Sequence, residues 1–487
     1  MWLTDVMIIL FAGAMLCLIL DLGKRYVKIW RRDLAGIVCT GVLGFALADL
    51  LFYLRSGIVG PISIRPTDST FASLYTVDKF GVFVIFTVLA VGTAVSFYSS
   101  RYLDPDDNVG PFNSLLLLLL LSLVGVVASG DLLTLFLFWE GMSIAAYGLV
   151  AFRKEVAVSL EAALKYLFLA GAGSLVALFG ISIIYTLTGS IQLKDLSLVL
   201  QNEPHIGIFG LAMLIVGLGV EAAIFPLHTW LPDAYSAAPV PISATLAGIV
   251  TGTAVFALIK IVNPAFMNAS LLLQVQISHL IQTSQIILAA IAVLTMLIGN
   301  LGALGQSNLK RMLSYSSIAH VGYMLAALAT FSVFGIVAIL FHIWNHGLVK
   351  SSFFMLTGNT GKEYENSELS SMKGMFGQNR FLGSMFALSS LGMIGVPPFG
   401  TFWSELLIIE ALFATESLTF YLVAVVIVLN IALSVGYFSR VITTVARDTH
   451  DVEKIEVSWR LTVSPLFLLL LSLATGFAPW LLLRMIS

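Results

Sequence analysis

Residues 221–241 read EAAIFPLHTWLPDAYSAAPVP, and this stretch separates two apolar runs, residues 209–220 before it and residues 242–259 after it. It contains four prolines, two carboxylates and a histidine. Pro226 lacks a backbone N–H and clashes with the preceding turn, so it predicts a broken or kinked helix. Broken backbone at membrane depth is tolerated only where protein or a watery cavity surrounds it. Because an ionised carboxylate inside a bilayer is costly, Glu221 is a candidate ion-handling residue.

The composition is that of a membrane protein. Of the 487 residues, 59% are hydrophobic and 11% are charged, and the mean hydropathy is +0.98. Many apolar runs reach the ~20 residues that cross the hydrocarbon core of a bilayer. The formal net charge of −2 argues against a nucleic-acid partner. The two cysteines, Cys17 and Cys39, provide neither a disulfide framework nor a metal motif. The sequence therefore predicts an all-α polytopic membrane protein that contacts the lipid bilayer.

The apolar runs predict about fourteen transmembrane helices. They lie near residues 4–21, 34–54, 80–99, 111–130, 132–152, 161–188, 206–231, 239–263, 284–304, 309–330, 333–358, 381–413, 418–443 and 461–483. The first run lacks a preceding basic stretch, so we expect a retained span rather than a cleaved signal peptide.

Lys and Arg are unevenly divided between the two sides of these spans. The loops after odd-numbered spans hold sixteen of them, five within residues 24–32, whereas the loops on the opposite side hold five. Cytoplasmic loops carry the excess of positive charge in membrane proteins. We therefore expect a multi-pass protein of the cell (inner) membrane with both termini on the outer side.

Two segments of the chain carry a similar set of residues. Lys165 precedes Glu221 at almost the same spacing as Lys350 precedes Glu405. Prolines also interrupt the second segment, at positions 397 and 398. An odd number of spans per unit inverts successive units, as in many transporters whose ion sites lie at interrupted helices. We therefore predict two inverted five-helix repeats, with Pro-broken helices 7 and 12.

These repeats divide the chain into four parts. We expect N-terminal helices 1–3 in residues 1–110, helices 4–8 in residues 111–263, helices 9–13 in residues 284–443 and a C-terminal helix 14 in residues 444–487.

Four ionisable residues lie in strongly apolar surroundings: Glu140, Lys165, Glu221 and Glu405. Ionisable side chains within membrane spans usually face the interior of a helix bundle and mark ion or proton paths. A buried ion pair with only a structural role is the alternative for each residue taken alone. Several such charges in one chain favour a path.

Three polar residues share one face of the predicted eleventh helix. His342, His346 and Lys350 are spaced by four, so they drift by less than a quarter of a turn along the helix. Histidine titrates near neutral pH, which suits a proton relay. No carboxylate or cysteine lies on the same face, so we predict no metal site. His228 and His320 are single polar groups whose role the sequence leaves open.

Two further charged residues have a structural alternative. Lys260 ends the eighth span, where its side chain could extend to the membrane interface or belong to a path. Asp233 follows the break, where we expect it to cap a helix. The sequence contains no nucleotide-binding loop, haem motif or Ser/His/Asp arrangement, so we predict no cofactor and no catalytic residue.

Several motifs together resemble a known family. They are FWEGMSIAAYGLV at residues 138–150, FPLHTWLPDAYSAAPVPISATLAG at residues 225–248 and FHIWNHGLVKSSFFMLTG at residues 341–358. They resemble the antiporter-like subunits of respiratory complex I, a family that includes Mrp-type cation/proton antiporters and membrane-bound hydrogenases. The resemblance covers roughly residues 75–415.

This resemblance implies fourteen helices, two inverted repeats, broken helices 7 and 12, and a row of charged residues that carries protons across the middle of the membrane. The glutamate of helix 5 falls on Glu140, and the Lys or Glu of helix 12 falls on Glu405. The polar face of helix 11 falls on His342, His346 and Lys350, and Lys165 matches a lysine of some members.

Two positions depart from the pattern of the family. Glu221 stands where helix 7 usually has a lysine, and Gly252 stands where helix 8 usually has Lys or His. Two carboxylates, Glu140 and Glu221, would then face each other and resist joint ionisation. Lys165 or Lys260 could supply the missing positive charge, the pair could bind Na⁺, or this half could conduct poorly.

The sequence thus predicts a proton-translocating subunit of a multi-subunit redox-driven ion pump or Mrp-type antiporter, without a redox site of its own. The predicted pathway residues are Glu140, Lys165, Glu221, His228, Lys260, His320, His342, His346, Lys350 and Glu405. We expect other membrane subunits as partners, including similar antiporter-like ones, and protons or Na⁺ as the transported ions. The alternatives are a cation path through Glu140 and Glu221, and a scaffold subunit that does not conduct.

Overall fold

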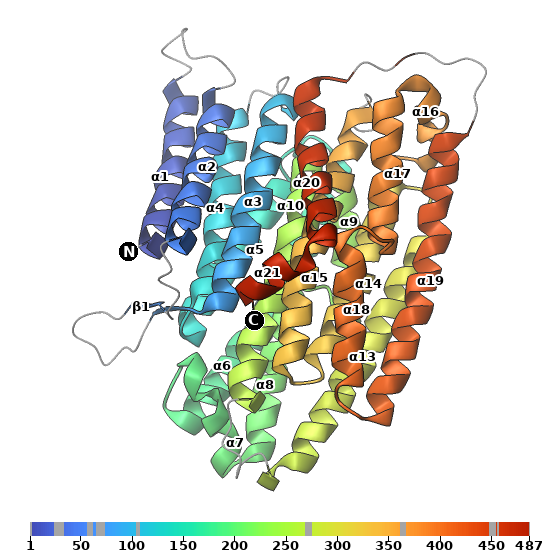
Figure 1. Cartoon of the computed structure of the whole chain (residues 1–487). Coiled ribbons are helices and arrows are strands. Elements are labelled where there is room, and N and C mark those ends of the chain that lie inside the picture. The colour runs from blue at the N-terminus through green and yellow to red at the C-terminus, as the bar shows by residue number, and fades with distance from the viewer. Residues whose placement is uncertain are drawn as a thin grey trace.

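The computed structural model describes residues 2–23, 34–55, 62–64, 74–103, 108–267, 275–360, 367–447, 454 and 457–486. These residues form a bundle of long helices whose axes run in roughly the same direction (Figure 1). The basic residues 24–32, on which the expected orientation partly rests, lie outside the described residues. So does Lys362, another of the sixteen basic residues counted above.

The N-terminal part of the chain lies at one edge of the bundle (Figure 1). It comprises α1 (Trp2–Gly23), α2 (Leu34–Arg55), β1 (Ile62–Ile64), β2 (Tyr75–Val77) and α3 (Lys79–Tyr102). The two short strands pair antiparallel.

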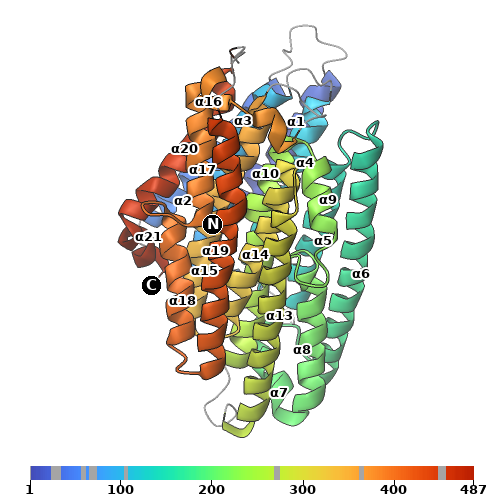
Figure 2. The ribbon, with the colours of Figure 1, turned by 90° about the vertical axis from the view of Figure 1, so that its right-hand side faces the viewer.

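The next helices contain the first predicted break. They are α4 (Val109–Ala128), α5 (Leu132–Val150), α6 (Ala157–Thr188), η1 (Leu193–Leu198), α7 (Val199–Asn202), α8 (Pro204–Gly219), α9 (Trp230–Ala237), α10 (Val240–Thr245), η2 (Leu246–Val250), α11 (Thr251–Val262) and η3 (Asn263–Met267). Figure 2 shows α6 at the outer edge of the bundle.

The remaining helices contain the second break. They are α13 (Ser278–Leu304), α14 (Leu309–Leu328), α15 (Val333–Thr357), η4 (Gly358–Thr360), η5 (Leu369–Met372), α16 (Met375–Gln378), α17 (Arg380–Ile394), α18 (Gly400–Phe413), α19 (Leu418–Ala446), α20 (Trp459–Phe477) and α21 (Pro479–Ile486).

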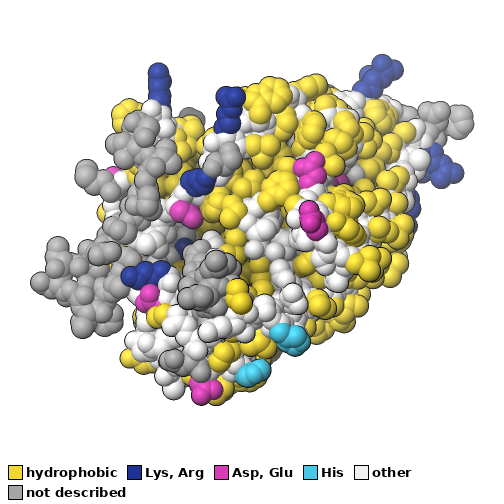
Figure 3. Space-filling model, turned by 60° about the horizontal axis from the view of Figure 1, so that its bottom comes forward, with side chains coloured by type: hydrophobic (Ala, Val, Ile, Leu, Met, Phe, Trp, Pro, Cys, Tyr) yellow, Lys and Arg dark blue, Asp and Glu magenta, His cyan; other side chains and the backbone are white. Residues whose placement is uncertain are grey.

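The chain is a multi-pass α-helical membrane protein, as predicted. Eleven helices in the described part of the chain are long and apolar enough to cross a membrane, and α8 and α17 are shorter apolar helices. The other expected spans correspond to α14 and to the two broken helices, α8 with α9 and α17 with α18. Hydrophobic side chains cover most of the described surface seen in Figure 3, as a lipid-facing surface requires. The count of fourteen and the division into four parts remain predictions.

The centre of the bundle is formed by α15 and by the continuous run α10–η2–α11. Every residue from Val240 to Ile259 is buried, as are nearly all residues of α15. The two elements approach closely because both have glycine at the crossing. A Cβ added to Gly347 would lie 2.5 Å from the backbone oxygen of Gly248. Small residues allow such contact between the backbones of membrane helices.

Both predicted breaks are present. Ten residues separate the end of α8 at Gly219 from the start of α9 at Trp230, and five separate the end of α17 at Ile394 from the start of α18 at Gly400. Each break contains a cis X–Pro bond, Phe225–Pro226 in the first and Pro397–Pro398 in the second. The expected capping role of Asp233 is wrong, because α9 begins after Thr229 without a side-chain cap. Asp233 instead forms ion pairs with Lys165 and Arg311.

One loop contact of the first half recurs in the second half. Asp131 forms a β-bridge with Gln192, and Asn308 forms one with Glu368 at almost the same separation along the chain. The side chains of Asp131 and Asn308 also cap the helices that follow them, α5 and α14. The helices α7 and α16, which follow these bridges in the chain, lie at opposite ends of the bundle (Figure 1). These contacts favour the predicted inverted repeats.

Candidate functional site

Three histidines lie in mutual contact at the centre of the bundle. His320 comes from α14, and His342 and His346 come from α15. Their ring centroids are 5.2 Å apart for His320 and His342, 4.7 Å for His320 and His346, and 5.6 Å for His342 and His346. We call these three residues the imidazole cluster. His320, which the sequence left open, therefore belongs with the histidines of the predicted helix face.

The imidazole cluster is connected to α18 by hydrogen bonds. His320 Nδ1 lies 3.1 Å from His342 Nε2, and His342 Nδ1 lies 2.9 Å from Ser404 Oγ. Each bond requires one donor and one acceptor, so a neutral His342 has one ring nitrogen in each role. His346 Nε2 is buried without a hydrogen-bond partner in the described part of the chain. A neutral imidazole that both donates and accepts can pass a proton along such a line.

Lys350 lies one turn beyond the imidazole cluster on α15. Its side chain is fully buried and donates to Ser316 Oγ and, at 3.1 Å, to the backbone oxygen of Leu313. Among the described residues, no carboxylate forms an ion pair with it. A buried amine held only by neutral oxygens can give up its proton at lower cost than one paired with a carboxylate.

Glu405 lies on α18, directly after Ser404, and only 5% of its surface is exposed. Its carboxylate turns back to the break, where a Cβ added to Gly395 would overlap it. Gly395 also has a φ of 77°, which an L side chain rarely adopts. Glycine at position 395 is thus required for two reasons: it allows the positive φ of the turn, and it leaves space for the Glu405 carboxylate.

In the first half, Glu221 is buried and its two oxygens are satisfied by hydroxyl groups. Ser143 donates to Oε1 at 2.6 Å, and Tyr166 donates to Oε2 at 2.5 Å. The ring of Tyr166 stacks on Trp230 of α9 at a centroid distance of 3.9 Å. Tyr166 therefore links Glu221, near the start of the break, to Trp230, the first residue after it.

Glu140 is half-buried on α5 and accepts a hydrogen bond from Ser174 of α6. Glu140 and Glu221 share no hydrogen-bond donor, and each has its own hydroxyl partners. Each carboxylate of the expected pair therefore lies against a separate set of hydroxyl groups. Within the described ranges, no group of three or more His, Cys, Asp or Glu side chains could hold a metal ion.

Lys165 is not buried in this chain, so that expectation is wrong. Its side chain is 49% exposed and pairs with Glu161 at 2.8 Å and with Asp233 at 3.1 Å. Arg311 shares Asp233 at 2.6 Å. Lys165 forms no ion pair with Glu140 or Glu221, so it does not replace the missing positive charge.

The recurring β-bridges favour a register that differs from the expected correspondence between Lys165 and Lys350. The recurring β-bridges align Asp131 with Asn308 and Gln192 with Glu368. Matching residues of the two bridges are 177 and 176 positions apart, whereas Lys165 and Lys350 are 185 positions apart.

Lys260 contacts the end of a helix. Its Nζ donates to the backbone oxygens of Val127 and Ser129, both at 2.5 Å, where α4 ends. Positively charged side chains stabilise the free carbonyl groups of a helix C-terminus. Like Lys165, it forms no ion pair with Glu140 or Glu221 among the described residues.

At Gly252, where the resemblance implies Lys or His in helix 8, Ile343 leaves no room for a longer side chain. A Cβ added to Gly252 would lie 2.9 Å from Cγ2 of Ile343. This contact is closer than real Cβ atoms allow, so Ile343 occupies the space that a longer side chain would need.

His228 lies within the first break, between α8 and α9. It is half-buried, its ring lies 5.7 Å from that of Phe225, and its Nδ1 has no hydrogen-bond partner in the described part of the chain. It makes none of the ring contacts that join the imidazole cluster.

Sequence reasoning missed the hydroxyl groups that hold the charged residues. These are Ser143, Tyr166, Ser174, Ser316 and Ser404. Serine is common in membrane helices, where it usually bonds its own backbone, so its presence alone carries little signal. Only Ser404, next to Glu405, and Ser143, one turn after Glu140, lie close enough in sequence to be suspected.

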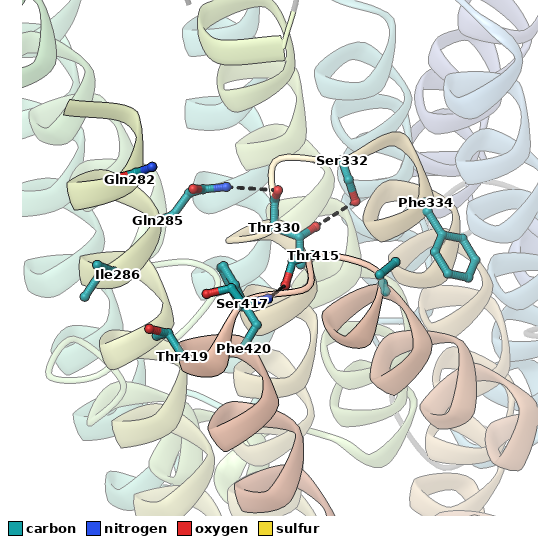
Figure 4. Close-up of a pocket in the computed structure, with 12 residues that line it drawn as sticks. Gln282, Gln285, Ile286, Thr330, Ser332, Phe334, Thr415, Ser417, Thr419 and Phe420 are labelled. Atoms are coloured by element: carbon teal, nitrogen blue, oxygen red, sulfur yellow. Dashed lines mark hydrogen bonds between the residues drawn. The ribbon is translucent and has the colours of Figure 1, made fainter. Parts of the chain in front are cut away.

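A polar cavity opens where α18 is joined to α19. It has a volume of 560 Å³ and is lined by residues of α13, of the connection between α14 and α15, and of the connection between α18 and α19 (Figure 4). Gln285 donates to the backbone oxygen of Thr330 at 3.0 Å, and the hydroxyls of Thr330 and Ser332 are 2.8 Å apart. Ala411, which follows Glu405 on the same helix, also lines it.

Known proteins resemble the chain over nearly its full length. Residues 129–430 match the family model described as NADH:quinone oxidoreductase/Mrp antiporter, TM. NADH-quinone oxidoreductase subunit N of Geobacillus kaustophilus (strain HTA426) is 30% identical over 483 residues, which cover 98% of this chain and 95% of that protein. Subunit N of Desulforudis audaxviator (strain MP104C) is 34% identical over 374 residues, which cover 75% of this chain and 71% of that protein.

Solved structures share the fold. A chain of the membrane-bound sulfane sulfur reductase, an archaeal respiratory membrane complex, has a TM-score of 0.86 at 27% identity and covers 99% of this chain and 96% of its own. A chain of respiratory complex I from Thermus thermophilus has a TM-score of 0.79 at 25% identity and covers 99% of both chains. A chain of the Mrp complex from Dietzia sp. DQ12-45-1b, at 20% identity, supports the fold alone with a TM-score of 0.83 over 98% of this chain and 96% of its own. Because the family match spans more than half of its length, this chain belongs to the NADH:quinone oxidoreductase/Mrp antiporter family of antiporter-like membrane subunits.

Proposed function

We propose that this chain conducts protons through its second half, along a line formed by Lys350, the imidazole cluster, Ser404 and Glu405. The observation that carries the proposal is the direct contact of three buried imidazoles, with His342 bonded to the serine that precedes Glu405. Each member of the line can hold or pass a proton. Burying such groups in a membrane protein is costly, and buried ionisable groups usually mark an ion or proton path.

The two ends of this line differ in chemistry. Lys350 begins it as a buried amine held by neutral oxygens, and Glu405 ends it as a buried carboxylate at the second break. The polar cavity lies one to two turns beyond Glu405 on α18, where Ala411 lines it together with hydroxyl and amide side chains. These positions support a path that leaves the protein at the junction of α18 and α19. By the positive-inside rule, that junction faces the outer side.

The energy for transport would come from other subunits. The relatives in bacteria are named as subunits of NADH-quinone oxidoreductase, and the structural relatives are chains of multi-subunit membrane complexes. We propose that this chain works in such a complex beside other membrane subunits, similar antiporter-like ones among them. The sequence also predicts Glu140, Glu221, His228, Lys165 and Lys260 as pathway residues of the first half. The contacts of Lys165 and Lys260 favour a structural role for these two.

A neutralising substitution at the exit tests the proposal. The complex is isolated through a tag on this chain and reconstituted in vesicles, and proton transport is measured with a pH-sensitive dye. We expect Glu405→Gln to lower transport about a hundredfold, which is the low end of the usual effect of losing one general acid or base. Glu410→Gln, on the same helix but exposed, is the matched control and retains transport. Full transport by an assembled Glu405→Gln complex would refute the proposal.

The alternative of a Na⁺ path through Glu140 and Glu221 receives less support from the geometry. A hard cation needs several oxygen ligands at one point. The two carboxylates are instead engaged by different hydroxyl groups, from Ser143 and Tyr166 for Glu221 and from Ser174 for Glu140. Transport that depends on Na⁺ in the native complex, and loses that dependence in Glu221→Lys, would revive this alternative.

The scaffold alternative applies best to the first half. Ile343 fills the space beside Gly252, and Lys260 contacts a helix end. Transport that survives substitution of both Glu140 and Glu221 by Gln, but not of Glu405, would show that the first half is not required for conduction.

A further inference from the structure

The last turn of α20 lies against the second break and the first turn of α18. The indole of Trp403 donates to the backbone oxygen of Gly476 at 2.8 Å. A Cβ added to Gly476 would overlap the backbone oxygen of Pro398, so glycine is needed for this close approach. Helix α20 packs against both α15 and α18. No residue of α20 belongs to the line proposed above.

A second contact joins α20 to α15 at the same place. Thr475 Oγ1 lies 2.6 Å from Asn345 Oδ1. Asn345 Nδ2 lies 2.9 Å from the backbone oxygen of Phe341, which can only accept, so the amide nitrogen points there and the amide oxygen faces Thr475. The hydroxyl of Thr475 therefore donates to Asn345. Both residues are buried, and Asn345 lies on α15 between His342 and His346.

The first residue of α18 rests on this pair. A Cβ added to Gly400 would overlap Asn345 Oδ1 and lie 2.5 Å from Thr475 Oγ1. Because five residues separate α17 from α18, contacts with other helices must fix the position of α18. Interhelical hydrogen bonds and close backbone contacts are what hold membrane helices together. Gly400 and Trp403 provide such contacts at the start of α18.

Both contacts lie next to the hydrogen bond that joins α18 to the imidazole cluster. Ser404 directly follows Trp403 in the chain, and its Oγ lies 2.9 Å from His342 Nδ1. His342 precedes Asn345 by three residues, about one turn of α15. Hydrogen bonds weaken steeply when their angle or distance departs from the ideal. The geometry between His342 and Ser404 therefore depends on how α18 is held against α15.

We propose that Thr475 of α20 is a positioning residue for proton transfer between His342 and Ser404. Its hydroxyl fixes the Asn345 amide, and this amide sets the distance between α15 and the first turn of α18. The inference rests on the proposed function and assigns the last long helix of the chain a role in it.

Removing the hydroxyl of Thr475 tests the inference. Thr475→Val keeps the shape of the side chain but cannot donate to Asn345. We expect proton transport by the reconstituted complex to fall about threefold to tenfold, as loss of one hydrogen bond between neutral groups implies. Thr475→Ser retains the hydroxyl and should retain transport. Thr462→Val is the matched control on α20, where the hydroxyl donates to the backbone oxygen of Trp459 at 3.0 Å. It should also retain transport.

A second variant tests the same inference if Thr475→Val does not assemble. Trp403→Phe keeps an aromatic ring but loses the hydrogen bond to Gly476. We expect a similar fall in transport. Trp480→Phe, at an exposed tryptophan of α21, is its control and should leave transport unchanged.

A double-mutant cycle separates positioning from a purely structural role. Ser404→Ala removes the hydroxyl that meets His342. If Thr475 acts through the bond between these two residues, adding Thr475→Val to Ser404→Ala lowers transport no further. Effects of independent sites would instead combine in full.

The outcomes separate this inference from the proposed function. If Ser404→Ala lowers transport while assembled Thr475→Val and Trp403→Phe complexes transport normally, the inference about α20 is wrong and the proton line stands. If Ser404→Ala and Glu405→Gln both leave transport intact, the proposed function is wrong. If Thr475→Val has the same effect with and without the Ser404 hydroxyl, Thr475 acts only through packing and the inference is overturned.

Discussion

Ser174 and Lys350 each donate a hydrogen bond to the residue 34 positions before them. Ser174 donates to Glu140 across α5 and α6, and Lys350 donates to Ser316 across α14 and α15. The two hydrogen bonds thus have the same spacing, with the charge on the earlier helix in the first and on the later helix in the second.

The placement of the Glu405 carboxylate at the second break depends on Gly395, and the substitution Gly395→Ala tests this dependence. In Gly395→Ala, the added Cβ meets the Glu405 carboxylate and the residue must adopt a positive φ, which costs an L residue roughly 1–2 kcal/mol. We expect lower thermal stability and a loss of proton transport close to that of Glu405→Gln.

Gly189→Ala separates strain from displacement of Glu405. Gly189 has a φ of 65° but no atom within 4 Å of an added Cβ. We expect a similar fall in stability with transport retained. Equal transport defects in the two alanine variants would show that the contact with Glu405 is irrelevant.

Ile343 fills the space beside Gly252. We therefore predict that replacing Gly252 by lysine, a residue that the family usually has at this position, disrupts packing. Gly252→Lys forces its Cβ against Ile343, and overpacking of this kind costs about 1–3 kcal/mol. We expect little of the assembled complex on a native gel. Gly252→Lys combined with Ile343→Ala removes the clash and should recover assembly. Normal assembly of the single variant would contradict the packing argument.

Lys260 should matter for stability rather than for transport. Its ammonium group binds the last carbonyls of α4, and such an interaction contributes roughly 0.3–1 kcal/mol. Lys260→Met should lower the thermal stability of the complex, and Lys260→Arg should preserve it. Arg440→Met is the matched variant, because Arg440 contacts the oxygens of Leu304 and Gln306 at the end of α13. A large loss of transport by Lys260→Met at unchanged stability would place Lys260 on the path.

The breaks and the polar face of α15 were predictable because each follows from local chemistry. Pro226 and the pair Pro397–Pro398 remove backbone donors within apolar runs, and the structure has a break at each. The spacing of four places His342, His346 and Lys350 on one side of any helix that contains them. All three are buried there.

Whether Lys165 points into the bundle or away from it was not predictable, because α6 lies at the outer edge of the bundle (Figure 2). Lys165 is surrounded in sequence by apolar residues, which suggested burial, yet many apolar residues of α6 are exposed on the outside of this chain. Lipid is as apolar as a protein core, so hydropathy does not distinguish the two. The buried hydrogen bonds that Asn300 forms with Tyr323 and Tyr437 were missed for another reason. These residues are uncharged and come from three helices, and only tertiary packing brings them together.

The most direct test of the proton line is the number of protons translocated per electron pair by the purified, reconstituted complex. Lys350→Met removes the amine that begins the line, and Lys373→Met removes an exposed lysine from the same chain as the control. We predict that the ratio falls in the fully assembled Lys350→Met complex and keeps its native value in Lys373→Met. A native ratio in Lys350→Met would contradict the account.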